Sequence, residues 1–99
     1  MDKVLVTLVM SKRLTQAVED LLLSCDLVSG FTTSSADGHG ITVELIDTGE
    51  QVAGHAARTI IRMVGSESDM RGVLAIIKEQ LPNANMFFWM TPLIDMGHL

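Results

Sequence analysis

The sequence predicts an α+β fold in which two helices cover one face of a four-stranded antiparallel sheet. Three observations lead to this prediction. Continuously apolar stretches typical of buried strands stand near both ends of the chain, and apolar residues recur with the helical period in two stretches between them. A polar excursion separates two further strand-like stretches. The 99 residues form a single domain, 1–99, in the order strand, helix, strand, strand, helix, strand.

The first strand and helix follow directly from apolar spacing. Val4–Met10 is almost continuously apolar and rich in β-branched residues, as expected for a central strand buried on both faces. Ser11 is expected to be the N-cap of the next helix. The apolar stripe of that helix follows the spacing i, i+3, i+4, i+7, i+8 and i+11: Leu14, Ala17, Val18, Leu21, Leu22 and Cys25.

The second strand is expected to start near Val28, with Gly30 marking a bulge or a close backbone approach. The small polar residues and glycines of Ser34–Gly40 predict a turn. Ile41–Gly54 is a mostly polar excursion, and with its margins the excursion covers about 36–55.

The second half of the chain repeats the pattern of strand and helix. Ala57–Val64 is the third strand, with Arg58, Ile60, Arg62 and Val64 on one face and Thr59, Ile61 and Met63 on the other. Ser66 followed by Asp69 resembles a capping box. The second helical stripe contains Met70, Val73, Leu74, Ile77 and Leu81.

The last strand is Met86–Met90, and Thr91-Pro92 is expected to end its pairing. This order of elements predicts a ferredoxin-like sandwich. The first and last strands are apolar on both faces, whereas the helices cover only one face. We therefore expect identical subunits to bury the other face.

Composition excludes several classes of function. A net charge of −5 argues against a nucleic-acid-binding protein, which needs a basic face. No apolar run reaches the roughly 18–20 residues that span a bilayer, so we expect no direct membrane insertion. The single cysteine, Cys25, forms no internal disulfide and suits a reducing compartment, and we expect a cytoplasmic protein. No nucleophile motif, P-loop or dinucleotide fingerprint is present, and we expect no enzyme.

The chain resembles the nitrogen-regulatory PII proteins and their CutA-like relatives over nearly its whole length. Val28-Ser29-Gly30-Phe31-Thr32 followed by Gly38-His39-Gly40 is similar to the PII strand that leads into the T-loop. Val64-Gly65-Ser66-Glu67 leading into a helix, and a last strand ending in Pro92-Leu93-Ile94, follow the family order. The resemblance looks closest to short PII-like proteins, some of which are encoded beside heavy-metal efflux systems.

The resemblance implies a homotrimer that binds a small effector, in PII an adenine nucleotide, in the clefts between subunits. The effector would contact residues at the base of the loop: Thr32, Gly38, His39, Gly40 and Thr42. Three departures from PII speak against ATP. Thr42 replaces a glutamine, Pro82-Asn83-Ala84-Asn85 is too short and lacks the phosphate-binding lysine, and Leu93-Ile94-Asp95-Met96 lacks the C-terminal arginines. A nucleoside monophosphate or a metal ion is easier to accommodate.

The same resemblance makes the excursion a partner-binding loop. Its docking residues would be Ile41, Val43, Leu45 and Glu50. An effector would order or release this loop, and the loop would then bind or leave an unidentified regulated protein, with a membrane transporter as one candidate.

Two alternatives stay open. In the first, the protein is a metal buffer or sensor linked to heavy-metal efflux that binds a transition-metal ion, since imidazoles and carboxylates are suitable ligands. The candidate ligands are His39, His55, Asp37, Glu44 and Asp47. In the second alternative, the chain is a purely structural trimeric module.

Overall fold

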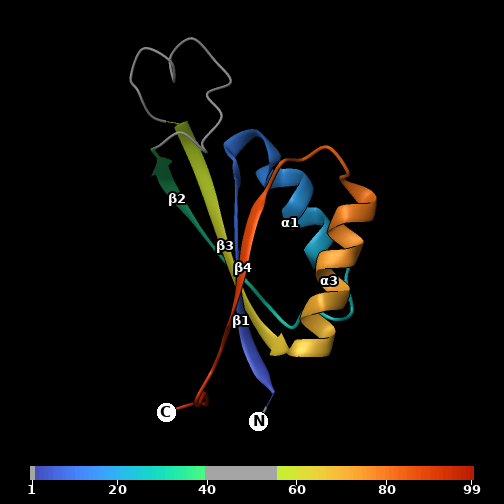
Figure 1. Ribbon diagram of the computed structural model, residues 1–99, viewed down its shortest axis with the longest axis vertical. Helices are drawn as coiled ribbons and strands as arrows, with labels where there is room; N and C mark the ends of the chain where they lie inside the picture. The colour runs from blue at the N-terminus through green and yellow to red at the C-terminus, as the bar shows by residue number, and fades with distance from the viewer. Residues whose placement is uncertain (1, 40–55) are drawn as a thin grey trace.

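The computed structural model describes residues 2–39 and 56–99 (Figure 1). The elements are β1 (Lys3–Ser11), a 3₁₀ helix η1 (Lys12–Leu14), α1 (Thr15–Leu23), β2 (Thr32–Gly38), β3 (Ala56–Ser66), α3 (Glu67–Gln80) and β4 (Phe87–Pro92). This confirms the predicted βαββαβ order. The four strands form one antiparallel sheet in the order β2-β3-β1-β4, with α1 and α3 on the same side of it (Figure 1).

The core lies between the two helices and the sheet. Along β1, Val4, Val6, Leu8 and Met10 alternate with the residues of the other face and are buried. Opposite them, α1 contributes Val18 and Leu22, and α3 contributes the stripe Met70, Val73 and Ile77. Both predicted apolar stripes face the core except for the exposed Ala17, although Leu14, Cys25 and Leu81 lie just outside the two α-helices.

The start of α1 is fixed to β3 by a pair of threonines. The Thr15 hydroxyl donates to the carbonyl of Lys12 at 2.8 Å and lies 2.6 Å from the hydroxyl of Thr59, which is 4% exposed. Because the single proton of Thr15 is already used, Thr59 donates in this second contact. The predicted N-cap Ser11 makes no side-chain capping bond, and the 3₁₀ turn takes its place.

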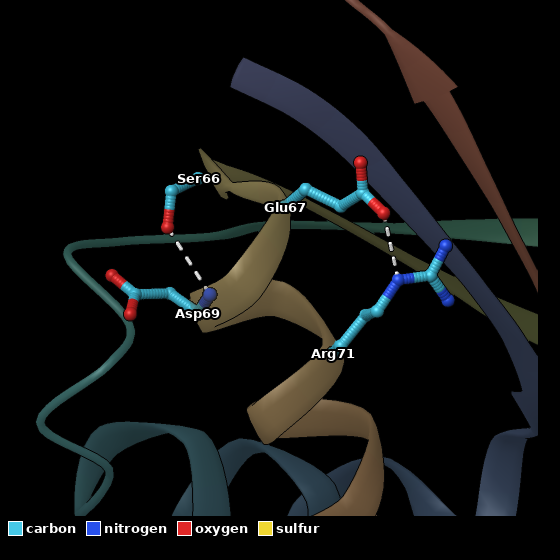
Figure 2. Close-up of polar contacts among 4 residues, drawn as sticks. All are labelled: Ser66, Glu67, Asp69 and Arg71. Atoms are coloured by element: carbon cyan, nitrogen blue, oxygen red, sulfur yellow. Dashed lines mark hydrogen bonds and ion pairs between the residues drawn. The ribbon is translucent and has the colours of Figure 1, made fainter. Parts of the chain in front are cut away.

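The N-terminus of α3 is capped as the sequence predicts. The Ser66 hydroxyl accepts from the backbone N–H of Asp69 at 3.1 Å (Figure 2). Figure 2 also shows the Arg71 Nε donating to Glu67 Oε2 at 2.8 Å, one turn apart. Both side chains of this ion pair are more than half exposed, so the pair stabilises α3 by only a few tenths of a kcal/mol, ~0.3–0.5.

The boundaries of β2 differ from the prediction. The strand begins at Thr32, not near Val28, and Gly30 lies outside it. Val28 and Phe31 pack against the core below the helices, which accounts for their apolar character without a strand. The small polar residues read as a turn, Ser34–Gly38, are in the strand, because β3 supplies hydrogen-bonding partners as far as the pair Gly38–Ala56.

The ends of β4 and α1 also differ. Pairing of β4 runs through Pro92, which lies opposite Val4, and the Leu93 N–H then donates to the Lys3 carbonyl at 3.0 Å. Proline is tolerated here because β4 is an edge strand. Helix α1 ends at Leu23, before the last residue of its predicted stripe, and that residue, the partly buried Cys25, follows the helix.

Candidate functional site

The face of the sheet opposite the helices, called the open face below, is the first candidate site. Directly opposed residues of antiparallel strands point to the same side, so the register assigns its members. These are Leu5, Thr7 and Val9 of β1, Arg58, Ile60, Arg62 and Val64 of β3, Thr32, Ser34, Ala36 and Gly38 of β2, and Phe87, Trp89 and Thr91 of β4. No helix of the described residues covers this face (Figure 1).

Apolar side chains dominate the open face on the β4 side. Phe87 is 48% exposed and Trp89 is 51% exposed, and the neighbouring apolar side chains of β1 and β3 are only partly buried. An aromatic pair of this kind on a monomer surface marks an interaction site. The predicted two-sided apolar character of the first and last strands is thus confirmed.

Two arginines stand among these apolar residues on β3. Arg62 lies in a row across the sheet with Thr32 on one side and Thr7 and then Trp89 on the other. Its Nη1 donates to the Ser34 hydroxyl at a long 3.4 Å, and the side chain is exposed. Thr7 is only 4% exposed although no helix covers it, because its long neighbours Arg62 and Trp89 flank it.

Arg58 occupies the same face four residues earlier. It lies opposite Ser11 and Ala36, and it is 9% exposed. Its Nη1 donates to the carbonyl of Ala57 at 3.3 Å. The prediction that Arg58 and Arg62 share one strand face is confirmed by the register.

The structure places the described members of the predicted effector set, Thr32, Gly38 and His39, at opposite ends of β2. Thr32 and Gly38 share the open face, but a strand advances about 3.3 Å per residue, so their Cα atoms lie about 20 Å apart. Exposed His39 follows the last pair of the strand, Gly38–Ala56. One chain therefore does not bring Thr32 together with Gly38 and His39.

The remaining predicted site residues lie outside the described residues. These are Gly40 and Thr42 of the effector set, Glu44, Asp47 and His55 of the metal set, and the loop residues Ile41, Val43, Leu45 and Glu50. Among residues 2–39 and 56–99, no three His, Cys, Asp or Glu side chains converge as metal ligands would. Asp37 is exposed on β2, on the strand face opposite to Gly38.

A cleft on the helix side of the sheet has no counterpart in the predictions. It has a volume of about 520 Å³ and lies between α3, the connection to β4, and β4 itself. Its lining residues are Leu8, Arg71, Leu74, Ala75, Ile77, Lys78, Leu81, Pro82, Ala84, Asn85, Met86 and Phe88. Sequence periodicity could not find it, because the cleft depends on where α3 sits across the strands.

The family assignment rests on the full length of the chain. The model of the family described as "Protein of unknown function (DUF3240)" matches residues 1–99, and the chain belongs to this family. None of the curated proteins compared with the chain is significantly similar in sequence. No helix among the described residues is long and apolar enough to cross a membrane.

Solved structures confirm the PII-like fold. A DUF3240 family protein from Shewanella baltica matches with a TM-score of 0.80 at 15% identity, covering 100% of this chain and 98% of that one. A nitrogen regulatory PII-like protein, CPII, from Thiomonas intermedia, bound to ADP, AMP and bicarbonate, matches with a TM-score of 0.71 at 14% identity, covering 98% and 94%. Arabidopsis thaliana PII bound to citrate matches with a TM-score of 0.67 at 16% identity, covering 93% and 75%.

Proposed function

We propose that this chain is a PII-like signalling protein. It assembles as a homotrimer through the open face, binds a small anionic effector between subunits, and regulates a partner protein through residues 40–55. The observation that carries the proposal is the open face itself, which combines half-exposed aromatic side chains with two arginines in one PII-like fold.

Self-assembly follows from the apolar part of the open face. Phe87, Trp89 and the partly buried aliphatic side chains of β1 and β3 lie on one face, where Arg62 and Thr7 interrupt them. Burial of apolar surface stabilises an assembly by about 25 cal/mol per Å². Identical copies that cover this face of one another would therefore gain free energy by associating.

The spacing along β2 supports the proposed position of the effector between subunits. A small molecule does not reach from Thr32 to Gly38, about 20 Å away on the same strand. An effector that contacts both ends of β2 therefore bridges two chains. This geometry supports a site between subunits.

The chemistry of the effector follows from Arg62. Its guanidinium is exposed on the open face beside the hydroxyl-bearing Thr32 and Ser34, a set that suits a carboxylate or phosphate oxygen. ADP, AMP, bicarbonate and citrate, which are bound in the similar structures, are all anions. The connection Pro82–Asn85 carries no cation for a triphosphate, and we place a monophosphate or a small carboxylate first.

Calorimetric titration of the purified protein with AMP, ADP, ATP, citrate and bicarbonate tests this assignment. We expect at least one of the smaller anions to bind more tightly than ATP. Arg62→Gln should weaken that binding about tenfold or more, since a hydrogen bond to a charged group is lost. Arg13→Gln, at an exposed arginine of η1, is the matched control and should change nothing. Unaltered binding to Arg62→Gln would remove Arg62 from the site.

The metal alternative is tested on the same protein. Titration with zinc, copper and nickel salts is compared between the wild type and the double variant His39→Ala, His55→Ala. Loss of metal binding in the double variant, together with indifference to the anions above, would replace the proposed effector by a metal ion.

A further inference from the structure

The cleft between α3 and β4 is separate from the site proposed above. Phe88 lies opposite Leu8 on the helix side of the sheet, whereas its neighbours Phe87 and Trp89 lie on the open face. Helix α3 packs mainly on β3 and β1, and on the helix side of the edge strand β4 Phe88 stays 56% exposed, whereas Met90 packs against the core. Figure 1 shows the connection from α3 to β4 closing one end of this region. Assembly through the open face therefore leaves the cleft accessible.

The floor and walls of the cleft are apolar. Leu8 and Ile77 are 1% and 4% exposed and form its deepest part, and Phe88, 56% exposed, stands on the β4 side. Leu74 and Met86 complete the walls, and the unbranched Met86 side chain adapts to an occupant. Ligand sites in proteins are typically clefts of about 300–1,000 Å³ with this apolar lining, and this one measures about 520 Å³.

The charged side chains that line the cleft are both basic, and one of them, Arg71, is paired with Glu67 just outside the lining. The chain has 12 acidic and 7 basic residues, yet the lining contains Arg71 and Lys78 and no Asp or Glu. Arg71 and Lys78 are two turns apart on one side of α3, separated by Leu74 and Ala75. Glu67 takes only the Nε of Arg71, so the terminal amino groups keep their donors, and Figure 2 shows them directed away from Glu67.

We propose that this cleft binds a small amphipathic anion, an apolar chain or ring system that ends in a carboxylate. The apolar body lies against Phe88, Leu74 and Met86, and the carboxylate pairs with Lys78, assisted by Arg71. At about 30 Å³ per water-sized group, the volume accommodates roughly 15 non-hydrogen atoms. That is the size of a medium-chain carboxylate.

Calorimetric titration of the full chain with decanoate, kept below its micelle concentration, tests the proposal. Decanol and decylamine serve as ligands of the same length without the negative charge. We expect decanoate to bind, decanol to bind about tenfold more weakly, and decylamine to bind most weakly, because the lining contains Lys78 and the Glu67-paired Arg71 and no Asp or Glu. Equal binding of decylamine and decanoate, or no binding of decanoate, overturns the proposal.

Two substitutions locate the ligand in the cleft. Lys78→Gln should weaken decanoate about tenfold and leave decanol unchanged, whereas Lys12→Gln, at an exposed lysine of η1, should affect neither. Phe88→Ala should weaken both ligands, since it removes a wall of the cleft. Decanoate affinity that is insensitive to both Lys78→Gln and Phe88→Ala contradicts the site.

The outcome is independent of the proposed assembly. Phe87→Ala alters the open face only and should retain decanoate binding, even where it disrupts the trimer. Loss of decanoate binding in Phe87→Ala would show that the cleft is not a site of the single chain.

Discussion

Two consecutive phenylalanines of β4 offer a sharp test of assembly. Phe87 and Phe88 are 48% and 56% exposed, but they lie on opposite faces of the edge strand. Phe87→Ala and Phe88→Ala remove the same atoms from neighbouring positions with similar exposure. Their effects on the folding of a single chain should therefore be similar, and only Phe87→Ala should weaken self-association.

The magnitude follows from the exposed area of Phe87. With 48% of a side chain of about 200 Å² exposed, about 100 Å² remains for a second copy to bury. At about 25 cal/mol per Å², this contributes about 2.5 kcal/mol per subunit and about 7 kcal/mol per trimer. At about 1.4 kcal/mol per tenfold, the association constant falls by about five decades, and the midpoint concentration of a trimer, which follows its square root, rises roughly 300-fold.

Sedimentation equilibrium over a dilution series measures this midpoint for the wild type and both variants. We expect a trimer in the wild type, a midpoint shifted by two to three decades (~300-fold) in Phe87→Ala, and a shift of less than about threefold in Phe88→Ala. Circular dichroism checks that both variants remain folded. A monomeric wild type, or equal shifts in the two variants, would refute the reasoning.

Two further pairs of neighbouring residues test the fold. Leu22→Ala should lower the free energy of unfolding by about 2–5 kcal/mol because this side chain is 1% exposed, whereas Leu23→Ala, at a side chain 76% exposed, should cost less than about 0.5 kcal/mol, both measured by urea denaturation. Ser66→Ala removes the acceptor for the Asp69 N–H and should cost about 1 kcal/mol in the same assay, and Ser68→Ala, at the exposed second residue of α3, should be nearly neutral. Equal effects within either pair would contradict the burial or the cap described above.

Most of the fold could be predicted because its periodic elements are strongly amphipathic. The alternation along β3 correctly separated Ile61 and Met63 from Arg58 and Arg62, since burial on one face imposes a period of two on any strand. The stripe of α3 was equally clear, and Ser66 marked its start.

The predicted bounds of the second strand were wrong because the composition of this segment does not match its hydrogen-bonded pairing. Val28 and Phe31 are apolar because they cover the core, not because they form a strand. Thr32–Gly38 is polar and yet forms a strand, because β3 supplies the hydrogen bonds and α1 adds a contact from Thr33 to Glu19 at 2.8 Å. Propensity at an edge strand is overridden by its partner.

The sequence predicted that one face of the sheet is uncovered, but it did not predict the distances between the residues of the candidate site. The sequence indicated an uncovered face and placed Arg62 with Arg58 on one face of their strand, whereas the row that joins Arg62 to Thr32 and Trp89 depends on the register of separate strands. Motif resemblance grouped Thr32 with Gly38, and only the extended strand between them shows that one chain separates the two. The cleft beside Phe88 depends on helix placement, which no local pattern encodes.

The small size of the domain connects the two sides of the sheet. A chain of 99 residues with 47% hydrophobic residues has more apolar surface than two helices can cover. The helices bury one face of the sheet around Leu8. The remaining apolar surface is exposed at the edge strand β4, where Phe87 and Trp89 lie on the open face and Phe88 lies beside α3. Both exposed surfaces carry arginine or lysine, whereas the chain as a whole is acidic. Apolar contact combined with a local positive charge selects anions with some apolar character, or copies of the chain that enclose an anion between them. The same imbalance that leaves a single copy incompletely covered thus supplies both of the surfaces that we propose for binding.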